Sequence, residues 1–497
     1  MNLQRLLQIT SRRVVRVGLH LAGLLLAVLA TIVIGFAVQA RLRLPDLQPW
    51  HRIVLAEEFH AGAATASTTF ADYLAREERL FAELQARVLQ APGAADRGPA
   101  NRYDPASVPG QLAASEHGNR SYEQVPAEVR GAVLLVHGLS DSPYSMHALA
   151  DWYFARGFYV LSLRLPGHGT LPSGLLDVRW QDWYEAVRLA AVHVRARAGG
   201  KPFHACGYST GAAVLTLLAA RSSTDDSLPR PDRLVLLSAA IGVSKFAALA
   251  NVASALAFVP YFEKADWLDV LPEFDPYKYN SFTVNAGNQI HRLTQELRAE
   301  FARAAAAGRL AHMPKILACQ SVIDATVNAA DVVHELLQPL PAGGHELIVF
   351  DVNRSESWSS LIAPGPREAM QRIREAPELP FRLTLVGNES AGSQQVAAYT
   401  REAGSRETKV EALALAWPRG VFSVGHVALP FAIDDPIYGL LPRAVERLPW
   451  PLGATVPRGE AGVTLVPFGD LARLRCNPFL AVILDRVGAA VDADLRH

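Results

Sequence analysis

"FHACGYSTGAAVLTLLAA", residues 203–220, decides the fold of this chain. Its first letters are mostly apolar or small, as in a strand buried on both faces of a sheet, and the letters after the serine suit a helix. Between them, Gly207-Tyr208-Ser209-Thr210-Gly211 matches the pattern G-x-S-x-G. Glycines on both sides of a serine are typical of a sharp strand-to-helix turn that has no room for side chains. The alternative is an ordinary serine in a small-residue bend.

Strand-like and helix-like segments alternate on both sides of this turn. Short apolar runs at 131–138, 158–169, 203–209 and 233–240 alternate with segments of helical spacing at 145–157, 181–200 and 210–223. The same alternation resumes with a strand at 315–324, a helix near 329–338, a strand at 345–353 and a last helix at 478–495. This pattern predicts an α/β fold, with parallel strands, helices on both faces and right-handed crossovers.

Composition excludes several classes of protein. The chain has 497 residues, of which 50% are hydrophobic and 19% charged, as in globular proteins. Lys plus Arg equals Asp plus Glu at 48 each, so the charge gives no sign of nucleic-acid binding. Cys206 and Cys319 lie in apolar runs and are predicted to be buried free thiols. There is no CxxC or HExxH pattern, so we predict no metal site.

The N-terminus carries a membrane signal. Residues 17–38 contain no formal charge, and a helix of that length spans about 33 Å, enough to cross a bilayer. Four arginines precede the stretch, which favours a cytoplasmic N-terminus and an extracytoplasmic remainder of the chain. We therefore predict an uncleaved single-pass anchor. The alternative is a cleaved signal peptide ending near the small residues 38–40, but the apolar stretch is longer than such peptides usually have.

Residues 41–130 form an N-terminal extension. Residues 69–91 have helical spacing, and a stretch rich in proline and glycine follows them. We expect this helix to pack on the main domain rather than to bind a partner.

The turn at Ser209 suits a nucleophile. The following helix would aim its unpaired N–H groups at the serine, where they favour negative charge. An oxyanion forming beside Ser209 would meet the N–H of Thr210. "VHGLSDSPYS", residues 136–145, supplies a second candidate donor, the N–H of Leu139 after His137-Gly138. Both loops leave the same edge of a parallel sheet, where α/β proteins bind ligands. The alternative for the second segment is a plain strand-to-helix loop.

"LLVHGLSDSPYS" (134–145), "LRLPGHG" (163–169) and "GYSTG" (207–211), in that order, resemble the α/β-hydrolase superfamily. The branch they resemble is that of monoglyceride-lipase-like and serine-aminopeptidase-like hydrolases. The resemblance covers 131–241 well and 313–353 moderately. It implies an α/β-hydrolase fold with a helical cap insertion, and active-site residues in the chain order Ser, then Asp or Glu, then His.

The N-terminal hydropathy and charge, together with the resemblance for the later residues, divide the chain into segments. These are a cytoplasmic basic segment (1–16), a transmembrane anchor (17–38), the extension (41–130), the first part of the core (131–241), a cap insertion (242–312), the second part of the core (313–353), a second insertion (354–412) and the C-terminal part with the histidine (413–497).

The acid should end a later strand. Asp324 does so in "KILACQSVIDATV", and with Val327 it resembles the D-x-x-V pattern of that branch. The alternative is that Asp324 only caps the helix that follows. Asp351, at the end of the next strand, is the reserve candidate.

The histidine should follow the last strands. His426 in "FSVGHVALPF" fits, because we expect a strand, a short Ser/Gly turn and then the histidine. His345, His334 and His497 suit this place less well. Asp324 and His426 are 102 positions apart, whereas related hydrolases usually separate them by a few tens. The segment 354–412 would therefore have to loop out, with residues 381–388 as a candidate additional strand.

Together these residues predict a membrane-anchored serine hydrolase that cleaves carboxylic esters through an acyl-enzyme and needs no cofactor. Lipid-like esters, such as lysophospholipids or monoglycerides, are the expected substrates. The apolar residues 246–259 in the cap would line an acyl-chain pocket, or else pack on the core. The alternatives are a peptidase of the same fold and a non-catalytic binding or assembly protein on this scaffold.

Overall fold

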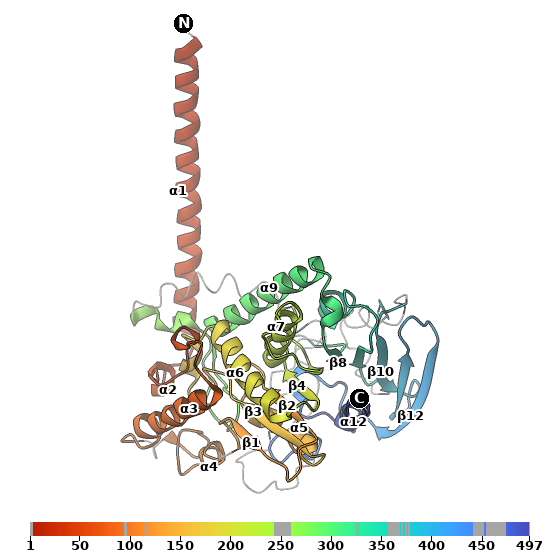
Figure 1. Ribbon diagram of the computed structural model, residues 1–497. Helices are drawn as coiled ribbons and strands as arrows, with labels where there is room; N and C mark the ends of the chain where they lie inside the picture. The colour runs from red at the N-terminus through yellow and green to blue at the C-terminus, as the bar shows by residue number, and fades with distance from the viewer. Residues whose placement is uncertain are drawn as a thin grey trace.

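A ten-stranded sheet runs through the centre of the protein in the computed structural model (Figure 1), in the order β1-β3-β2-β4-β5-β8-β9-β10-β11-β12. The structure describes residues 3–93, 97–115, 117–242, 260–324, 327, 329–355, 368, 371–372, 375, 378–440, 452–453 and 474–496. The strands are β1 (Tyr122–Gln124), β2 (Gly131–Val136), β3 (Phe158–Leu163), β4 (Phe203–Tyr208), β5 (Arg233–Leu237), β8 (Lys315–Ser321), β9 (Glu346–Phe350), β10 (Arg382–Asn388), β11 (Gln395–Arg401) and β12 (Thr408–Ala416).

The central strands are parallel, as the apolar runs predicted. Pairing from β3 through β2, β4, β5, β8 and β9 to β10 is parallel throughout, whereas β1, β11 and β12 pair antiparallel at the two edges. Every residue of β2, β3, β4 and β5 is buried. Successive side chains of β2 enter two different apolar cores, because a strand alternates its side chains between faces.

Helices cover both faces of the sheet. They are α3 (Phe70–Leu84), α4 (Val108–Ala113), α5 (His147–Phe154), α6 (Trp180–Ala198), α7 (Thr210–Thr224), α9 (Val284–Ala306), α10 (Ala329–Asp331) and α12 (Leu480–Asp494), with short α2 (Pro49–Arg52) near the N-terminus. Helices α6, α7 and α9 pack on one face, with α3 outside α6, while α5 and α12 cover the other (Figure 1). The three cysteines are all buried and free.

The extension belongs to the same body as the core. α3 continues into a π-helical turn, η2 (Gln85–Leu89), and together they occupy the segment expected to be helical. Phe70 and Tyr73 of α3 join the core on the α6 side, and β1 adds to the sheet beside β3. The expectation that this helix packs on the main domain is confirmed.

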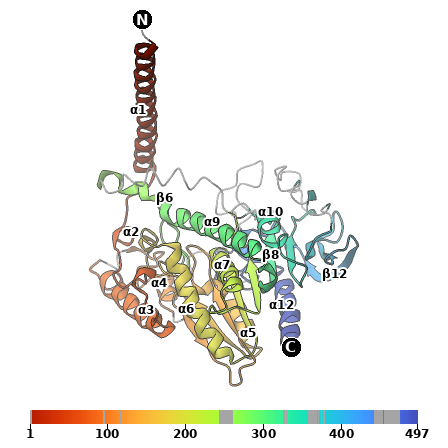
Figure 2. The ribbon, with the colours of Figure 1, turned by 45° about the horizontal axis from the view of Figure 1, so that its top comes forward.

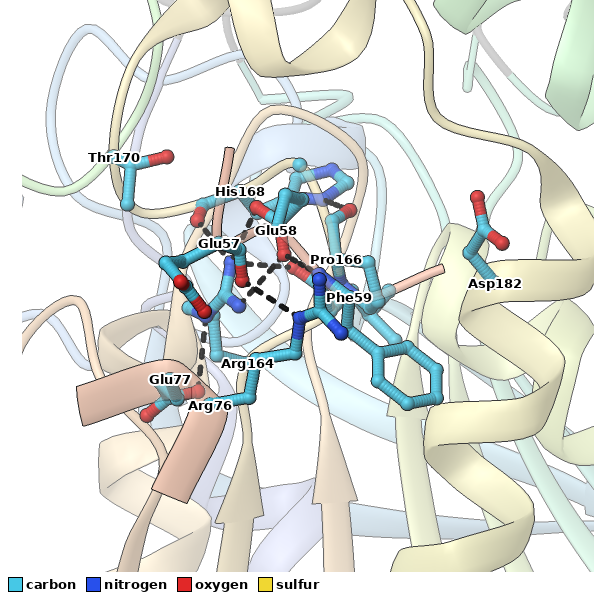
Figure 3. Close-up of polar contacts among 12 residues, drawn as sticks. Glu57, Glu58, Phe59, Arg76, Glu77, Arg164, Pro166, His168, Thr170 and Asp182 are labelled. Carbon is cyan, nitrogen blue, oxygen red and sulfur yellow. Dashed lines mark hydrogen bonds and ion pairs between the residues drawn. The ribbon is translucent and has the colours of Figure 1, made fainter. Parts of the chain in front are cut away.

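A buried arginine fastens the extension to the end of β3 (Figure 3). The side chain of Arg164 is only 1% exposed. Its guanidinium donates to both carboxylate oxygens of Glu58, at 2.9 and 3.1 Å, and to Glu77 at 2.9 Å. It also donates to the carbonyl of His168 at 2.9 Å. Both carboxylates come from the extension, so the loop after β3 and the extension share one ionic cluster.

The N-terminal helix α1 (Leu3–Arg43) projects from the body (Figure 1). Residues Val17–Arg43 are long and apolar enough to cross a membrane, by length and composition alone. The base of α1 packs against η6 (Pro260–Asp266), and the short strands β6 (Trp267–Asp269) and β7 (Phe282–Thr283) follow in the chain (Figure 2). Lys264 donates to the carbonyl of Leu44 and to Asp46, both at 2.9 Å.

Part of the segment 354–412 enters the sheet instead of looping out. The candidate strand at 381–388 is β10, which pairs parallel with β9. β11 and β12, which the sequence pattern did not predict, continue the sheet as an antiparallel meander. The apolar segment 246–259 of the cap insertion lies outside the described residues.

Candidate active site

Ser209 sits at a strained turn between β4 and α7. Its backbone has φ 53° and ψ −113°, a conformation that side-chain-bearing residues rarely adopt. A Cβ on Gly207 would lie 2.5 Å from the backbone N of Ala212. A Cβ on Gly211 would collide with the carbonyl oxygen of Val136 in β2. The two glycines therefore permit the tight turn that presents the serine hydroxyl above the sheet.

Three side chains that are far apart in sequence meet at this turn. His426 Nε2 lies 3.0 Å from Ser209 Oγ, and His426 Nδ1 lies 2.9 Å from Asp324 Oδ2. A carboxylate can only accept, so Nδ1 carries the proton and Nε2 of the neutral ring is free to accept from the serine hydroxyl. The side chains of His426 and Asp324 are 7% and 0% exposed. The sequence-predicted Ser209, Asp324 and His426 thus form one hydrogen-bonded chain.

The side chain of Asp324 contacts both His426 and its own loop. Its Oδ1 accepts from the backbone N–H of Val327 at 2.8 Å, while Oδ2 faces His426. The first bond is a local turn contact that precedes α10, and it joins the Asp and Val positions of the D-x-x-V pattern through the backbone. The reserve candidate Asp351 lies elsewhere, where it pairs with Arg354 at 3.0 Å.

The segment before His426 differs from the expectation. We expected a strand directly before the Ser/Gly turn, but residues 422–425 form none, and the strand that precedes them, β12, ends at Ala416. Asn353, just after β9, holds this segment instead. Its backbone N–H donates to the carbonyl of Phe422, and its side-chain amide donates to the carbonyl of Val421, both at 2.8 Å. These two hydrogen bonds hold the segment without the regular pairing of a β-strand. They leave no periodic pattern in the sequence, so sequence reasoning missed Asn353.

The loop after β2 faces the same edge. His137 donates from Nδ1 to the carbonyl of Gly138 at 2.8 Å and accepts at Nε2 from the backbone N–H of Leu165 at 3.0 Å. Burial lowers the pKa of His137 well below its ordinary value, so the ring stays neutral and keeps both bonds. His137 therefore supports the loop and joins it to the segment after β3.

The two candidate oxyanion donors belong to these loops. Thr210 is the first residue of α7, so its N–H has no acceptor within the helix. Leu139 follows Gly138, where a Cβ would lie 2.8 Å from the ring of Tyr208. Ser140 and Ser238 share the positive φ of Ser209, at 62° and 44°. Backbone strain of this kind gathers at functional sites, and here it marks three loops at the carboxyl edge of the sheet.

Comparison with known proteins relates part of the chain to a family. Residues 127–312 match the family described as serine aminopeptidase, S33. Over 55 residues the chain is 42% identical to a thermostable monoacylglycerol lipase from Bacillus sp. (strain H-257), a match that spans 11% of this chain and 22% of that protein.

Two similar solved structures are monoglyceride lipases. The enzyme from Paleococcus ferrophilus is 16% identical, with 47% of this chain and 89% of that chain covered and a TM-score of 0.35. A soluble variant of the enzyme from Saccharomyces cerevisiae, in complex with a substrate analog, is also 16% identical, with 46% and 81% covered and a TM-score of 0.35. The family match, the lipase relative and the sheet that carries the three motifs show that this chain has an α/β-hydrolase fold, in which residues 127–312 belong to the monoglyceride-lipase-like and serine-aminopeptidase-like branch.

Proposed function

We propose that the protein is a serine hydrolase that cleaves carboxylic esters through a Ser209, His426 and Asp324 triad. The observation that carries this proposal is the hydrogen-bonded chain from Ser209 Oγ through His426 to Asp324, with contacts of 3.0 and 2.9 Å. A serine hydroxyl is a weak nucleophile by itself, and a neutral imidazole in this position can take its proton as attack proceeds.

The reaction proceeds in two steps. Ser209 Oγ attacks the ester carbonyl while His426 Nε2 accepts the proton, and Asp324 stabilises the resulting imidazolium. The N–H groups of Leu139 and Thr210 bind the oxyanion, and each such donor lowers the barrier by about 3 kcal/mol. His426 then protonates the leaving alcohol, which leaves an acyl-serine. A water deprotonated by His426 hydrolyses that ester and regenerates the serine.

The proposed substrates are lipid-like esters, namely monoglycerides or lysophospholipids. The lipase relative supports a glyceride-like acyl ester. We further propose that α1 is an uncleaved anchor with its N-terminus in the cytoplasm and the catalytic domain outside it. An apolar helix that emerges beside the cap insertion supports a substrate drawn from lipid.

An ester panel on the full-length protein in detergent tests the proposal. It would contain p-nitrophenyl esters from acetate to dodecanoate, a monoglyceride and an aminoacyl p-nitroanilide. We expect ester turnover, labelling by a fluorophosphonate probe, and loss of both in Ser209→Ala, with turnover at least a thousandfold lower. Ser222→Ala, which alters another buried serine on α7, is the matched control and should retain both.

Each other result has a definite meaning. Cleavage of the anilide without the esters would favour a peptidase. An absence of labelling in the folded wild-type protein would favour a non-catalytic scaffold. Equal ester turnover in Ser209→Ala and the wild type would overturn the assignment of the nucleophile.

A further inference from the structure

A carboxylate lies beside the proposed oxyanion loop. Asp141 follows Leu139 by two residues and is only 6% exposed. The loop turns back on itself, since the N–H of Asp141 donates to the carbonyl of Gly138 at 3.3 Å. A Cβ on Gly138 would lie 3.0 Å from Asp141 Oδ2, so the carboxylate packs directly against the residue before Leu139.

Negative charge at this place opposes the proposed chemistry. An oxyanion that forms beside Leu139 N–H is repelled by a nearby carboxylate, and burial weakens the screening of that repulsion. Burial raises the pKa of Asp141, whereas Lys278 and His426 both favour its charged form. The site therefore needs a cation that offsets the charge of Asp141.

The cap insertion supplies that cation. Lys278 Nζ lies 2.8 Å from Asp141 Oδ1, with the two side chains 26% and 7% exposed. The next residue, Tyr279, donates its backbone N–H to the carbonyl of Ser140 at 2.8 Å. Its hydroxyl accepts from the N–H of Thr170 at 2.8 Å. This piece of the cap is thus seated on the loops after β2 and β3 together.

A second buried carboxylate fixes the position of the lysine. Asp275 Oδ1 accepts from the backbone N–H groups of Tyr277 and Lys278, at 3.1 and 3.2 Å. The charge of Asp275 is itself balanced by Arg475 at 2.8 Å. Lys278 is therefore left to pair with Asp141.

We propose that Lys278 and Asp141 are a positioning pair, in which the cap holds the oxyanion loop in place and offsets the carboxylate beside it. This inference rests on the proposed hydrolase function. According to this inference, the cap stabilises the transition state as well as binding the substrate. Lys278 contacts neither substrate nor nucleophile and works through the loop.

The pairing predicts unequal effects of its two members. Lys278→Met leaves an uncompensated carboxylate beside the oxyanion, and we expect kcat for p-nitrophenyl butyrate to fall at least 30-fold with KM changed less than threefold. Asp141→Asn removes the repulsive charge together with the ion pair. Its fold-loss of kcat should therefore be less than a third of the loss in Lys278→Met. The double variant, with Lys278→Met and Asp141→Asn together, should have a kcat at least tenfold higher than that of Lys278→Met. Lys278→Arg keeps the charge and should retain most of the turnover.

Controls separate this inference from the function on which it rests. Arg188→Met breaks a partly buried ion pair within α6, away from the candidate site, and should leave kcat unchanged. Fluorophosphonate labelling of Ser209, with thermal unfolding, shows for each variant that the site is folded and the nucleophile competent.

If the wild type is labelled and active, two results would overturn the proposed role of the Lys278–Asp141 pair and leave the proposed hydrolase function standing. One is near-normal kcat in Lys278→Met. The other is equal losses in both single variants with no recovery in the double variant, as an ordinary structural ion pair would give. If Ser209 in the folded wild type takes no label and no ester is cleaved, the proposed function and the pairing both fall.

Discussion

Arg164→Met should destabilise the whole protein, because it removes the cation that pairs with both Glu58 and Glu77 (Figure 3). Breaking a buried ion pair by deleting one partner costs about 3–5 kcal/mol, since the remaining charge stays buried and unpaired. Unfolding entropy of about 2.1 cal/mol/K per residue gives roughly 0.95 kcal/mol/K for about 450 residues. A loss of about 4 kcal/mol therefore lowers the midpoint of thermal unfolding by about 4 °C.

The assay is thermal unfolding of the full-length protein in detergent, followed by tryptophan fluorescence at pH 7. Arg79→Met is the matched control, because Arg79 on α3 pairs with Glu57, the neighbour of Glu58, but is 57% exposed. An exposed pair contributes at most about 1 kcal/mol, so the control should move the midpoint by about 1 °C or less. Equal midpoints for Arg164→Met and the control would refute the reasoning.

The same cluster has a signature in acid. Burial alone would raise the pKa of Glu58, but the ion pair and hydrogen bonds with Arg164 lower it below its ordinary value. A carboxyl group whose folded-state pKa is depressed stabilises the fold above its unfolded pKa, and this contribution is lost as pH falls through the folded value. Arg164→Met should therefore lose less stability than the wild type when the pH falls below about 4.5.

Three further perturbations test contacts elsewhere in the fold. Asp494→Asn removes the α12 carboxylate that Arg233 binds at 2.6 Å, so unfolding in urea should need less denaturant at pH 7. Although burial opposes it, the hydrogen bonds from His204 and Arg233 hold the pKa of Asp494 well below its usual range. The difference in stability between the variant and the wild type should therefore shrink as the pH falls below about 4. Gly211→Ala places a methyl group against the carbonyl of Val136, and fluorophosphonate labelling should slow more than tenfold; normal labelling would contradict this account of the turn. Burial lowers the pKa of His51 to about 4, so protonation destabilises the fold as pH drops from about 6.5 toward 4. His51→Gln should flatten the pH dependence of the unfolding midpoint in that range, and an unchanged slope would argue against it.

Local signals explain why much of the core was predictable. Residues 131–241 alternate between fully buried strands and helices, and parallel strands buried on both faces produce continuous apolar runs. The glycines around Ser209 and the D-x-x-V spacing at Asp324 are also short patterns with direct structural causes. The contact of His426 with both residues could be anticipated from chain order and position.

Long-range contacts explain most of what was missed. Strands β11 and β12 form an antiparallel edge, and β12 is largely exposed, so its letters show no buried run. Glu58 lies 106 positions from Arg164, and Lys278 lies 137 positions from Asp141. In the sequence each of these is an unremarkable charged residue, since only the fold supplies its partner.

Under the anchoring proposed above, the packing of α1 against the cap insertion would couple the candidate active site to the physical state of the surrounding lipid. A transmembrane helix adapts to a thinner or thicker bilayer by changing its tilt. Leu44, directly after α1, accepts a hydrogen bond from Lys264, and Arg52 of α2 pairs with Glu263. In the proposed anchor, tilting of α1 would therefore act on the insertion that also carries Lys278. Turnover in vesicles of graded acyl-chain length would then vary with membrane thickness, even for a water-soluble ester that never enters the lipid.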